Sequence, residues 1–239
     1  MADSYHAAVY WPDRQESAAA CARRAEDFFH LLSRCDPIYS RWFEQADTPE
    51  EALQLPFEPT SDVFLRFFAQ ERYQLGREGF SFGAWTGHPE DGRGGGVLLY
   101  CGSAAEVAPN SCQLHLPWPQ REPEGPRVLN VPVLKEVLRA LVRSWEPEVG
   151  VIVSDDFRET MRTQGDWRES VGWLMYLSRA RGEVPRLPAP VHVEPFEDKG
   201  TLIILTPERL QGTNPEHLEL GLRVQALMDE KDLLRPVVP

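Results

Sequence analysis

The sequence lacks the features of membrane proteins, of secreted proteins and of small domains that are stabilised by a metal ion. Its 239 residues contain no run approaching the roughly 18 consecutive apolar residues of a membrane span. No basic patch followed by an apolar stretch occurs at the N-terminus, so we expect no secretory signal and a cytoplasmic protein. The four cysteines have neither a C-x-x-C pair nor zinc-ligand spacing, and we expect reduced thiols without metal at Cys21, Cys35, Cys101 and Cys112.

Positive charge is also scarce. The chain has 25 Lys and Arg residues against 37 Asp and Glu residues, which gives a formal net charge of -12. This charge repels phosphate groups, so the composition disfavours direct binding of nucleic acid or of an anionic membrane. It suits a basic protein partner, although acidity that only maintains solubility explains the same composition.

The sequence also lacks the common motifs of catalytic and phosphate-binding sites. The glycine-rich stretch Gly92–Gly96 precedes a predicted strand, where a phosphate-binding loop requires a helix. No G-x-S-x-G or H-E-x-x-H element occurs. The alternative function is a metal-dependent hydrolase that uses Asp155, Asp156 and Glu159, because these acids follow a predicted buried strand. Since the same acids suit a helix N-terminus, the residues by themselves leave enzymatic function unsupported.

The pattern of apolar residues predicts an α+β fold. Hydrophobic residues make up 42% of the chain, and their spacing predicts helices over Glu16–Arg34 and Pro132–Trp145, with a last helix starting near Asn214. The predicted strands are His6–Trp11, Gly79–Trp85, Gly96–Gly102, Ser111–Pro117, Val149–Ser154, Gly172–Ser178, Val191–Glu194 and Thr201–Leu205. This order predicts a single domain, residues 1–239, with a largely antiparallel sheet covered by helices. We expect flexible loops near residues 88–95 and 119–127.

Local signals predict several turns and helix ends. Thr48–Glu51 has a capping residue, a proline and two acids, which marks the start of a short helix. Ser61 or Asp62 is expected to cap the next helix, and a further short helix is expected over 155–162. Gly200 is expected to supply the positive φ of a hairpin turn, and the last helix carries Leu222 on its apolar side.

A series of short motifs runs through nearly the whole chain. They are Ala8-Val9-Tyr10-Trp11, Cys35-Asp36-Pro37, Trp42-Phe43, Gly79-Phe80, Trp85-Thr86-Gly87, Pro109-Asn110-Ser111-Cys112, Trp145-Glu146-Pro147, Gly172-Trp173, Tyr176-Leu177-Ser178-Arg179, Val193-Glu194-Pro195, Gly200-Thr201-Leu202, Leu205-Thr206-Pro207-Glu208-Arg209 and Asn214-Pro215-Glu216-His217. In order and spacing they resemble the immunity protein 52 family of bacterial polymorphic-toxin systems. The sequence departs from the family pattern at Thr86, where Asn is expected, so a side-chain amide does not act there.

The resemblance implies a cytoplasmic antidote that binds and neutralises a cognate secreted toxin. For this family the toxin is expected to be a DNase with a restriction-endonuclease-like fold, and neither catalysis nor a cofactor is implied. The Trp, Gly and Pro residues of the motifs are expected to build the scaffold. Toxin contacts are expected on exposed surface elsewhere, and the sequence leaves the oligomeric state open.

One segment stands out as a candidate toxin-binding site. Between Phe43 and Leu65 there are six acids and no Lys or Arg, namely Glu44, Asp47, Glu50, Glu51, Glu58 and Asp62. We predict that these acids attract a basic cleft, while Leu53 and Phe57 provide the apolar contacts that hold it. The alternative is that the acids form only the solvated face of helices.

Overall fold

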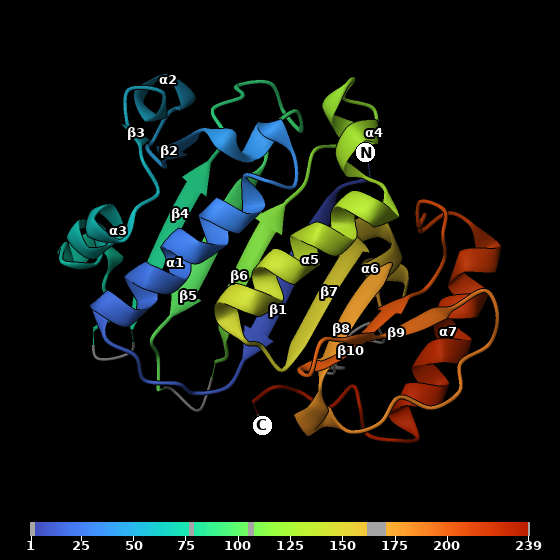
Figure 1. Cartoon of the computed structure of the whole chain (residues 1–239). Coiled ribbons are helices and arrows are strands. Elements are labelled where there is room, and N and C mark those ends of the chain that lie inside the picture. Colours follow the sequence, from blue (N-terminus) through green and yellow to red (C-terminus); the bar gives the residue numbers. More distant parts are fainter. Residues whose placement is uncertain (1–2, 77–78, 105–107, 162–170, 239) are drawn as a thin grey trace.

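The computed structural model describes residues 3–76, 79–104, 108–161 and 171–238. Within these residues the chain folds around one ten-stranded sheet in the order β3-β2-β4-β5-β6-β1-β7-β8-β10-β9 (Figure 1). Every neighbouring pair is antiparallel, which confirms the predicted α+β class. The strands are β1 (Tyr5–Trp11), β2 (Trp42–Glu44), β3 (Pro56–Phe57), β4 (Phe80–Trp85), β5 (Gly96–Cys101), β6 (Asn110–His115), β7 (Val149–Ser154), β8 (Leu174–Ser178), β9 (His192–Phe196) and β10 (Gly200–Ile204).

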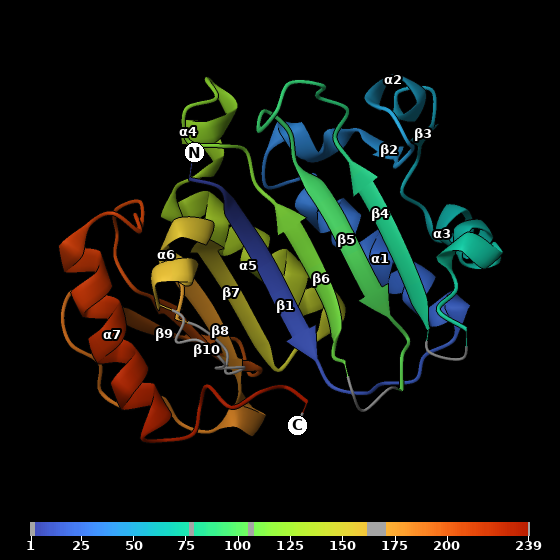
Figure 2. The same ribbon diagram turned by 180° about the vertical axis from the view of Figure 1, so that it is seen from behind.

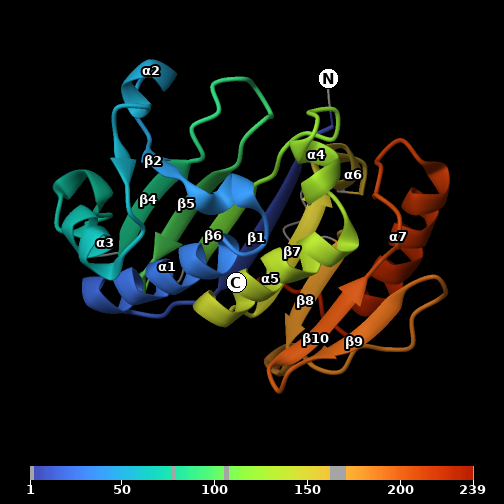
Figure 3. The same ribbon diagram turned by 45° about the horizontal axis from the view of Figure 1, so that its top comes forward.

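The helices cover the two faces of the sheet unequally. In the described residues they are α1 (Ala18–Leu32), α2 (Pro49–Ala52), α3 (Ser61–Phe68), α4 (Glu124–Val128), α5 (Val131–Trp145), α6 (Asp155–Met161) and α7 (Pro215–Asp229). The two long helices α1 and α5 lie side by side over one face (Figures 1 and 3). On the other face, α6 and α7 pack together beside the C-terminal strands (Figure 2). None of these helices has the length and apolar content needed to cross a bilayer.

Helix α5 forms where the sequence predicts it. The side chain of Asn130 accepts a hydrogen bond from the backbone N–H of Val133 at 3.1 Å, which caps the helix, and Pro132 occupies its first turn. Its predicted apolar face is fully buried and comprises Leu134, Val137, Leu138, Leu141, Val142 and Trp145. The helix therefore holds β1, β7 and β8 through one continuous apolar stripe.

Strands β4, β5, β6 and β1 form the open half of the sheet, which is covered on one face. Directly opposite residues of antiparallel strands share a face, so the register places Phe82, Leu99, Cys112 and Val9 together beneath the helices, where all four are buried. Figure 2 shows the reverse side of these strands with none of the described helices in front of it. We call the accessible part of this side the open face, and its nine residues are Tyr10, Ser81, Gly83, Trp85, Gly96, Leu98, Tyr100, Gln113 and His115. His6, Ala8 and Ser111 point to the same side but are buried.

Both edge strands of the described sheet contain proline. Strand β3 has two residues, of which Pro56 is one, and β9 carries Pro195 opposite Thr201 of β10. Proline has no N–H group to donate to a further strand. The described sheet thus ends on both sides in strands that are poor templates for further pairing.

The structure corrects several details of the sequence analysis. The segment 119–127, expected to be a loop, contains the start of α4, whereas 88–95 is irregular as predicted and its flexibility stays a prediction. In the β9–β10 turn the left-handed residue is Glu197, with φ 51°, and not Gly200. Gly200 is required because a Cβ there would lie 2.1 Å from the carbonyl oxygen of Leu177. The short helix predicted over 155–162 is present as α6 from Asp155 to Met161, and Arg162 lies outside the described residues.

Another correction concerns which side of α7 is buried. The helix begins after the cap Asn214, as predicted, but its buried residues are His217, Gly221, Val224 and Met228. Leu222, assigned to the apolar side, is 56% exposed. The space over Gly221 is filled by Phe157 and Met161 of α6, so the closest contact is made at a residue without a side chain.

Candidate functional site

The acidic segment folds as β2, α2, β3 and the start of α3, at the β3 edge of the sheet (Figure 1). Strands β2 and β3 were not predicted. Five of its six acids are exposed, and none of the five has an ion pair among the described residues. We call them the acidic corner, which comprises Asp47, Glu50, Glu51, Glu58 and Asp62. The unpaired carboxylates leave a strongly negative surface at one end of the open half.

The caps of α2 and α3 determine how these acids are presented. The Thr48 hydroxyl accepts a hydrogen bond from the N–H of Glu51 at 3.2 Å, as the sequence predicts. In α3 the cap is Thr60, which accepts from the N–H of Val63 at 3.4 Å, and not Ser61 or Asp62 as expected. Because Asp62 is not used as the cap, its carboxylate remains exposed in the first turn of α3.

Glu44 differs from the other five acids. Its carboxylate accepts hydrogen bonds from the Arg72 guanidinium at 2.6 Å and from the Tyr73 hydroxyl, and its side chain is 13% exposed. Burial, followed by the hydrogen bond to Glu44, raises the pKa of Tyr73. Glu44 therefore holds β2 to the segment that follows α3.

The two apolar residues of the predicted site lie in different surroundings. Phe57 is half-buried, and its ring packs edge-on against Phe64 and Phe67 of α3, with centroids 5.9 and 5.4 Å away, so it belongs to the core. Leu53 is half-buried and lines a pocket of about 390 Å³ together with Arg41 and Phe43. Leu53 is thus closer to accessible surface than Phe57 is.

Of the three acids of the hydrolase alternative, Asp155 is already bound by other side chains of the protein. The Ser4 hydroxyl donates to Asp155, the ring of His6 lies 3.3 Å from the same carboxylate, and Arg158 donates to it at 2.9 Å. A guanidinium beside the carboxylate opposes a second cation there. Glu159 is exposed, and no group of three His, Cys, Asp or Glu in the described residues is arranged to hold a metal ion.

His6 is shaped by the same cluster. His6 is the second residue of β1, and its side chain is buried. This burial, reinforced by the charge of Arg158, lowers its pKa from 6.5 to about 4. The nearby Asp155 carboxylate acts in the opposite direction and is outweighed. Because Asp155 lies between Ser4 and His6, the three side chains do not have the order in which a histidine activates a serine.

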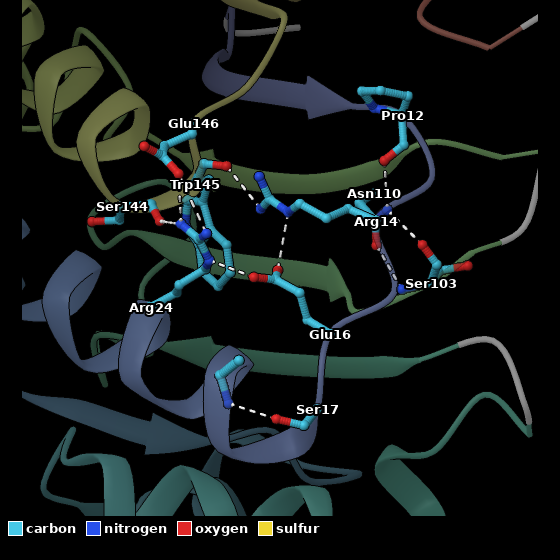
Figure 4. Close-up of polar contacts among 11 residues, drawn as sticks. Pro12, Arg14, Glu16, Ser17, Arg24, Ser103, Asn110, Ser144, Trp145 and Glu146 are labelled. Atoms are coloured by element: carbon cyan, nitrogen blue, oxygen red, sulfur yellow. Dashed lines mark hydrogen bonds and ion pairs between the residues drawn. The ribbon is translucent and has the colours of Figure 1, made fainter.

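Two arginines close the C-terminal end of α5 (Figure 4). Arg14 donates to the carbonyl of Trp145 at 2.9 Å, and Arg24 donates to the carbonyl of Ser144 at 2.9 Å. Glu16 accepts from both guanidinium groups, at 3.1 and 2.8 Å. This arrangement satisfies helix carbonyls that have no partner inside α5 and ties the β1–α1 connection to the helix.

Several residues of the short motifs that resemble immunity protein 52 make contacts that stabilise the fold. Trp11 stacks on Trp145 with ring centroids 5.3 Å apart. The side chain of Asn110 donates to the carbonyls of Pro12 and Ser103, each at 3.0 Å, and accepts from the N–H of Ser103 (Figure 4). Thr86 is buried, and its hydroxyl accepts from the N–H of Gly95 at 2.9 Å. For Trp11 and Trp145 the expectation of a scaffold role is confirmed.

Comparison with known proteins identifies a family and a solved structure with a similar fold. The family model for immunity protein 52 matches residues 3–237. Among solved structures, Pseudomonas aeruginosa T6SS protein PA0821 is similar in fold, with a TM-score of 0.59 and 13% identity over 98% of this chain and 73% of that chain. No curated protein matches the chain. Since the family model matches nearly every residue, the chain belongs to the immunity protein 52 family.

Proposed function

We propose that this protein binds a cognate bacterial toxin in the cytoplasm and neutralises it by forming a stoichiometric complex. The observation that carries the proposal is the match of the immunity protein 52 model over residues 3–237. A similar fold in a Pseudomonas aeruginosa T6SS protein supports a toxin that passes between competing bacteria. Inhibition of this kind needs surface complementarity and no cofactor.

The toxin is proposed to be a DNase with a restriction-endonuclease-like fold. The surface on which a nuclease binds DNA is basic, because it neutralises phosphate charge. A chain with a net charge of -12 and five unpaired acids at one corner complements such a surface. The acidic charge thus favours a nuclease over a toxin with an acidic or neutral target-binding surface.

The test combines binding with protection. The toxin domain encoded beside this gene is purified, and its cleavage of plasmid DNA is followed with increasing amounts of this protein. We expect cleavage to stop at a 1:1 ratio, and size-exclusion chromatography to show the complex. An unrelated protein of equal negative charge serves as control. Full cleavage in the presence of excess protein, with no complex formed, would refute the proposal.

The hydrolase alternative is tested with the variant D155N/D156N. If immunity depends on binding alone, this variant inhibits the toxin as wild type does, provided that circular dichroism shows the fold intact. A folded variant that no longer protects would contradict the proposed mechanism.

A further inference from the structure

We propose that the toxin docks on the open face of the sheet, with the acidic corner at the rim of the same contact surface. The inference rests on the proposed function and names the surface that performs it. It differs from the sequence-based prediction, because that prediction placed the apolar contacts at Leu53 and Phe57. In the structure Phe57 packs into the core, so Leu53 is the only one of the two at a pocket, and the open face offers further apolar contacts.

The composition of the open face is unusual for a surface in contact with water. An antiparallel sheet with one face in water alternates apolar and polar residues, and the polar ones point outward. Here Leu98, Tyr100 and Trp85 occupy outward positions and are half-buried. None of the nine residues of the open face is Asp, Glu, Lys or Arg, although these types make up 26% of the chain. Depletion of charge and enrichment in aromatic residues mark the centre of a protein interface.

The open face is continuous with the acidic corner. Trp85, at the end of β4, lines a pocket of about 340 Å³ together with Asp47, Thr48 and Pro49 at the start of α2. The side chain of Gln45 lies over Gly83, where an added Cβ would be 2.2 Å from its Oε1 atom. Figure 2 shows α2 beyond the end of β4, so a partner lying on β4 and β5 reaches the corner over this pocket.

The size of the open face argues against a second copy of this chain as the occupant. Four strands about 4.8 Å apart, each about six residues long, give a projected area of about 400 Å². Two such faces in contact bury about 800 Å², less than the roughly 1,200 Å² at which stable interfaces begin. Two copies would also each bring a charge of -12. A basic partner that covers both the open face and the acidic corner meets neither obstacle.

The two parts of the surface have different physical effects. Unpaired acids at the corner act at a distance and speed the encounter with a basic cleft. Leu98 and Tyr100, near the middle of the face, exclude water on contact and slow dissociation. Occupation of the cleft by this surface would deny it to DNA.

The first experiment uses Leu98→Ala and Tyr100→Ala, with Leu222→Ala as the matched control. Leu222 is 56% exposed on α7, away from the open face. Affinity for the toxin is measured by biolayer interferometry. We expect each face variant to lose on the order of 10- to 100-fold in affinity and the control to bind as wild type. Thermal melting verifies that all three variants are folded. Face variants that bind with wild-type affinity would refute the docking surface.

A second experiment varies only the sign of the charge at Gln113, in the middle of the face. Gln113→Arg and Gln113→Glu introduce side chains of opposite charge at one position. If the occupant is basic, Gln113→Arg weakens binding more than Gln113→Glu does, and the difference shrinks as salt rises. Equal affinities of the two variants and wild type would contradict the proposal.

Light scattering of the free protein provides the remaining control. If wild type is a dimer that Tyr100→Ala converts to a monomer, while toxin binding is unchanged, the open face joins two copies and the proposal is wrong. Failure of wild type to bind the toxin refutes the proposed function itself. Normal toxin binding by every face variant refutes only this inference.

Discussion

Strand β7 and strand β5 show what coverage on two faces and on one face does to a sheet. All six residues of β7 are buried, with α5 packed on one side and α6 on the other, and its run of Val and Ile residues suits that setting. In β5, burial alternates because helices cover one side of it, yet Leu98 and Tyr100 on the other side are also apolar or aromatic. The apolar content of β7 is accounted for by the fold. The fold does not account for the apolar content of β5, whereas the proposed docking of a toxin does.

The largest expected effect is a difference in stability between two identical substitutions. Leu138 is fully buried on α5, next to Gly150 of β7, so Leu138→Ala should lower the free energy of unfolding by about 2 to 5 kcal/mol. Leu98→Ala, on the open face, should cost less than about 1 kcal/mol, because water already reaches that side chain. Urea denaturation measures both. An equal loss in the two variants would mean that the open face is packed as tightly as the core.

A pH titration probes the N-terminal end of β1, where the two halves of the sheet meet. Since burial lowers the pKa of His6 to about 4, the folded protein holds this ring neutral while the unfolded chain binds a proton below pH 6.5. His6 therefore costs no stability above pH 6.5. Below that pH its neutral state in the folded protein lowers the free energy of unfolding, by at most about 3 kcal/mol as the pH drops toward 4. His6→Gln should remove most of this slope when unfolding is measured between pH 7.5 and 4.5. A slope unchanged in the variant would assign the loss to other groups.

A smaller effect is expected at the end of α5, the helix that packs on β1 of the open half and on β7. Arg24→Gln removes the hydrogen bond to the carbonyl of Ser144 and should cost about 1 to 2 kcal/mol. The neighbouring exposed Arg23 provides the control, since Arg23→Gln should change stability by less than about 0.5 kcal/mol. Thermal denaturation compares the two variants. Equal melting temperatures would show that these capping contacts contribute little.

The acidic corner should affect stability least and association most. Reversing Glu50 and Glu51 to Lys should change the free energy of unfolding by less than about 0.5 kcal/mol, because both are exposed. It should slow association with the toxin strongly at 0.01 M salt, where the Debye length is about 30 Å, and less at 0.1 M, where it is about 10 Å. The same reversal at Glu219 on α7 and at Glu230, the residue that caps its C-terminal end, controls for net charge. Equal slowing by both pairs would make the effect one of total charge and not of the corner.

The sequence predicts the fold best where one pattern extends over many residues. Helix α5 repeats its apolar spacing over four turns, and β7 is an uninterrupted apolar run, so both were assigned correctly. Strand β3 has two residues and leaves no periodic signal, and α4 contains Gly125 and Pro126, which normally oppose a helix. The buried side of α7 was assigned wrongly because the contact is made at Gly221, where no side chain reveals it.

The candidate site was harder to predict, for a physical reason. The acidic segment is contiguous in the chain and could be found by counting charges. The open face draws its residues from four strands, of which β1 and β6 are about 100 residues apart in the sequence, and it exists only through their register. A signal for it was present in β5, where Leu98 and Tyr100 interrupt the expected alternation. Which side of β5 the helices would leave uncovered depends on tertiary packing, and local spacing does not contain that information.

The proline-bearing edge strands restrict the manner in which a partner can be recognised. A toxin cannot readily extend the described sheet by adding a strand of its own, because Pro56 and Pro195 interrupt the hydrogen-bonding pattern at the two edges. Recognition then depends on side chains of a surface and hardly at all on backbone hydrogen bonds, which are the same for every sequence. A single substitution on such a surface changes which toxin is accepted while the backbone stays as it is. The backbone of the sheet can thus stay the same in related immunity proteins whose side chains bind different toxins.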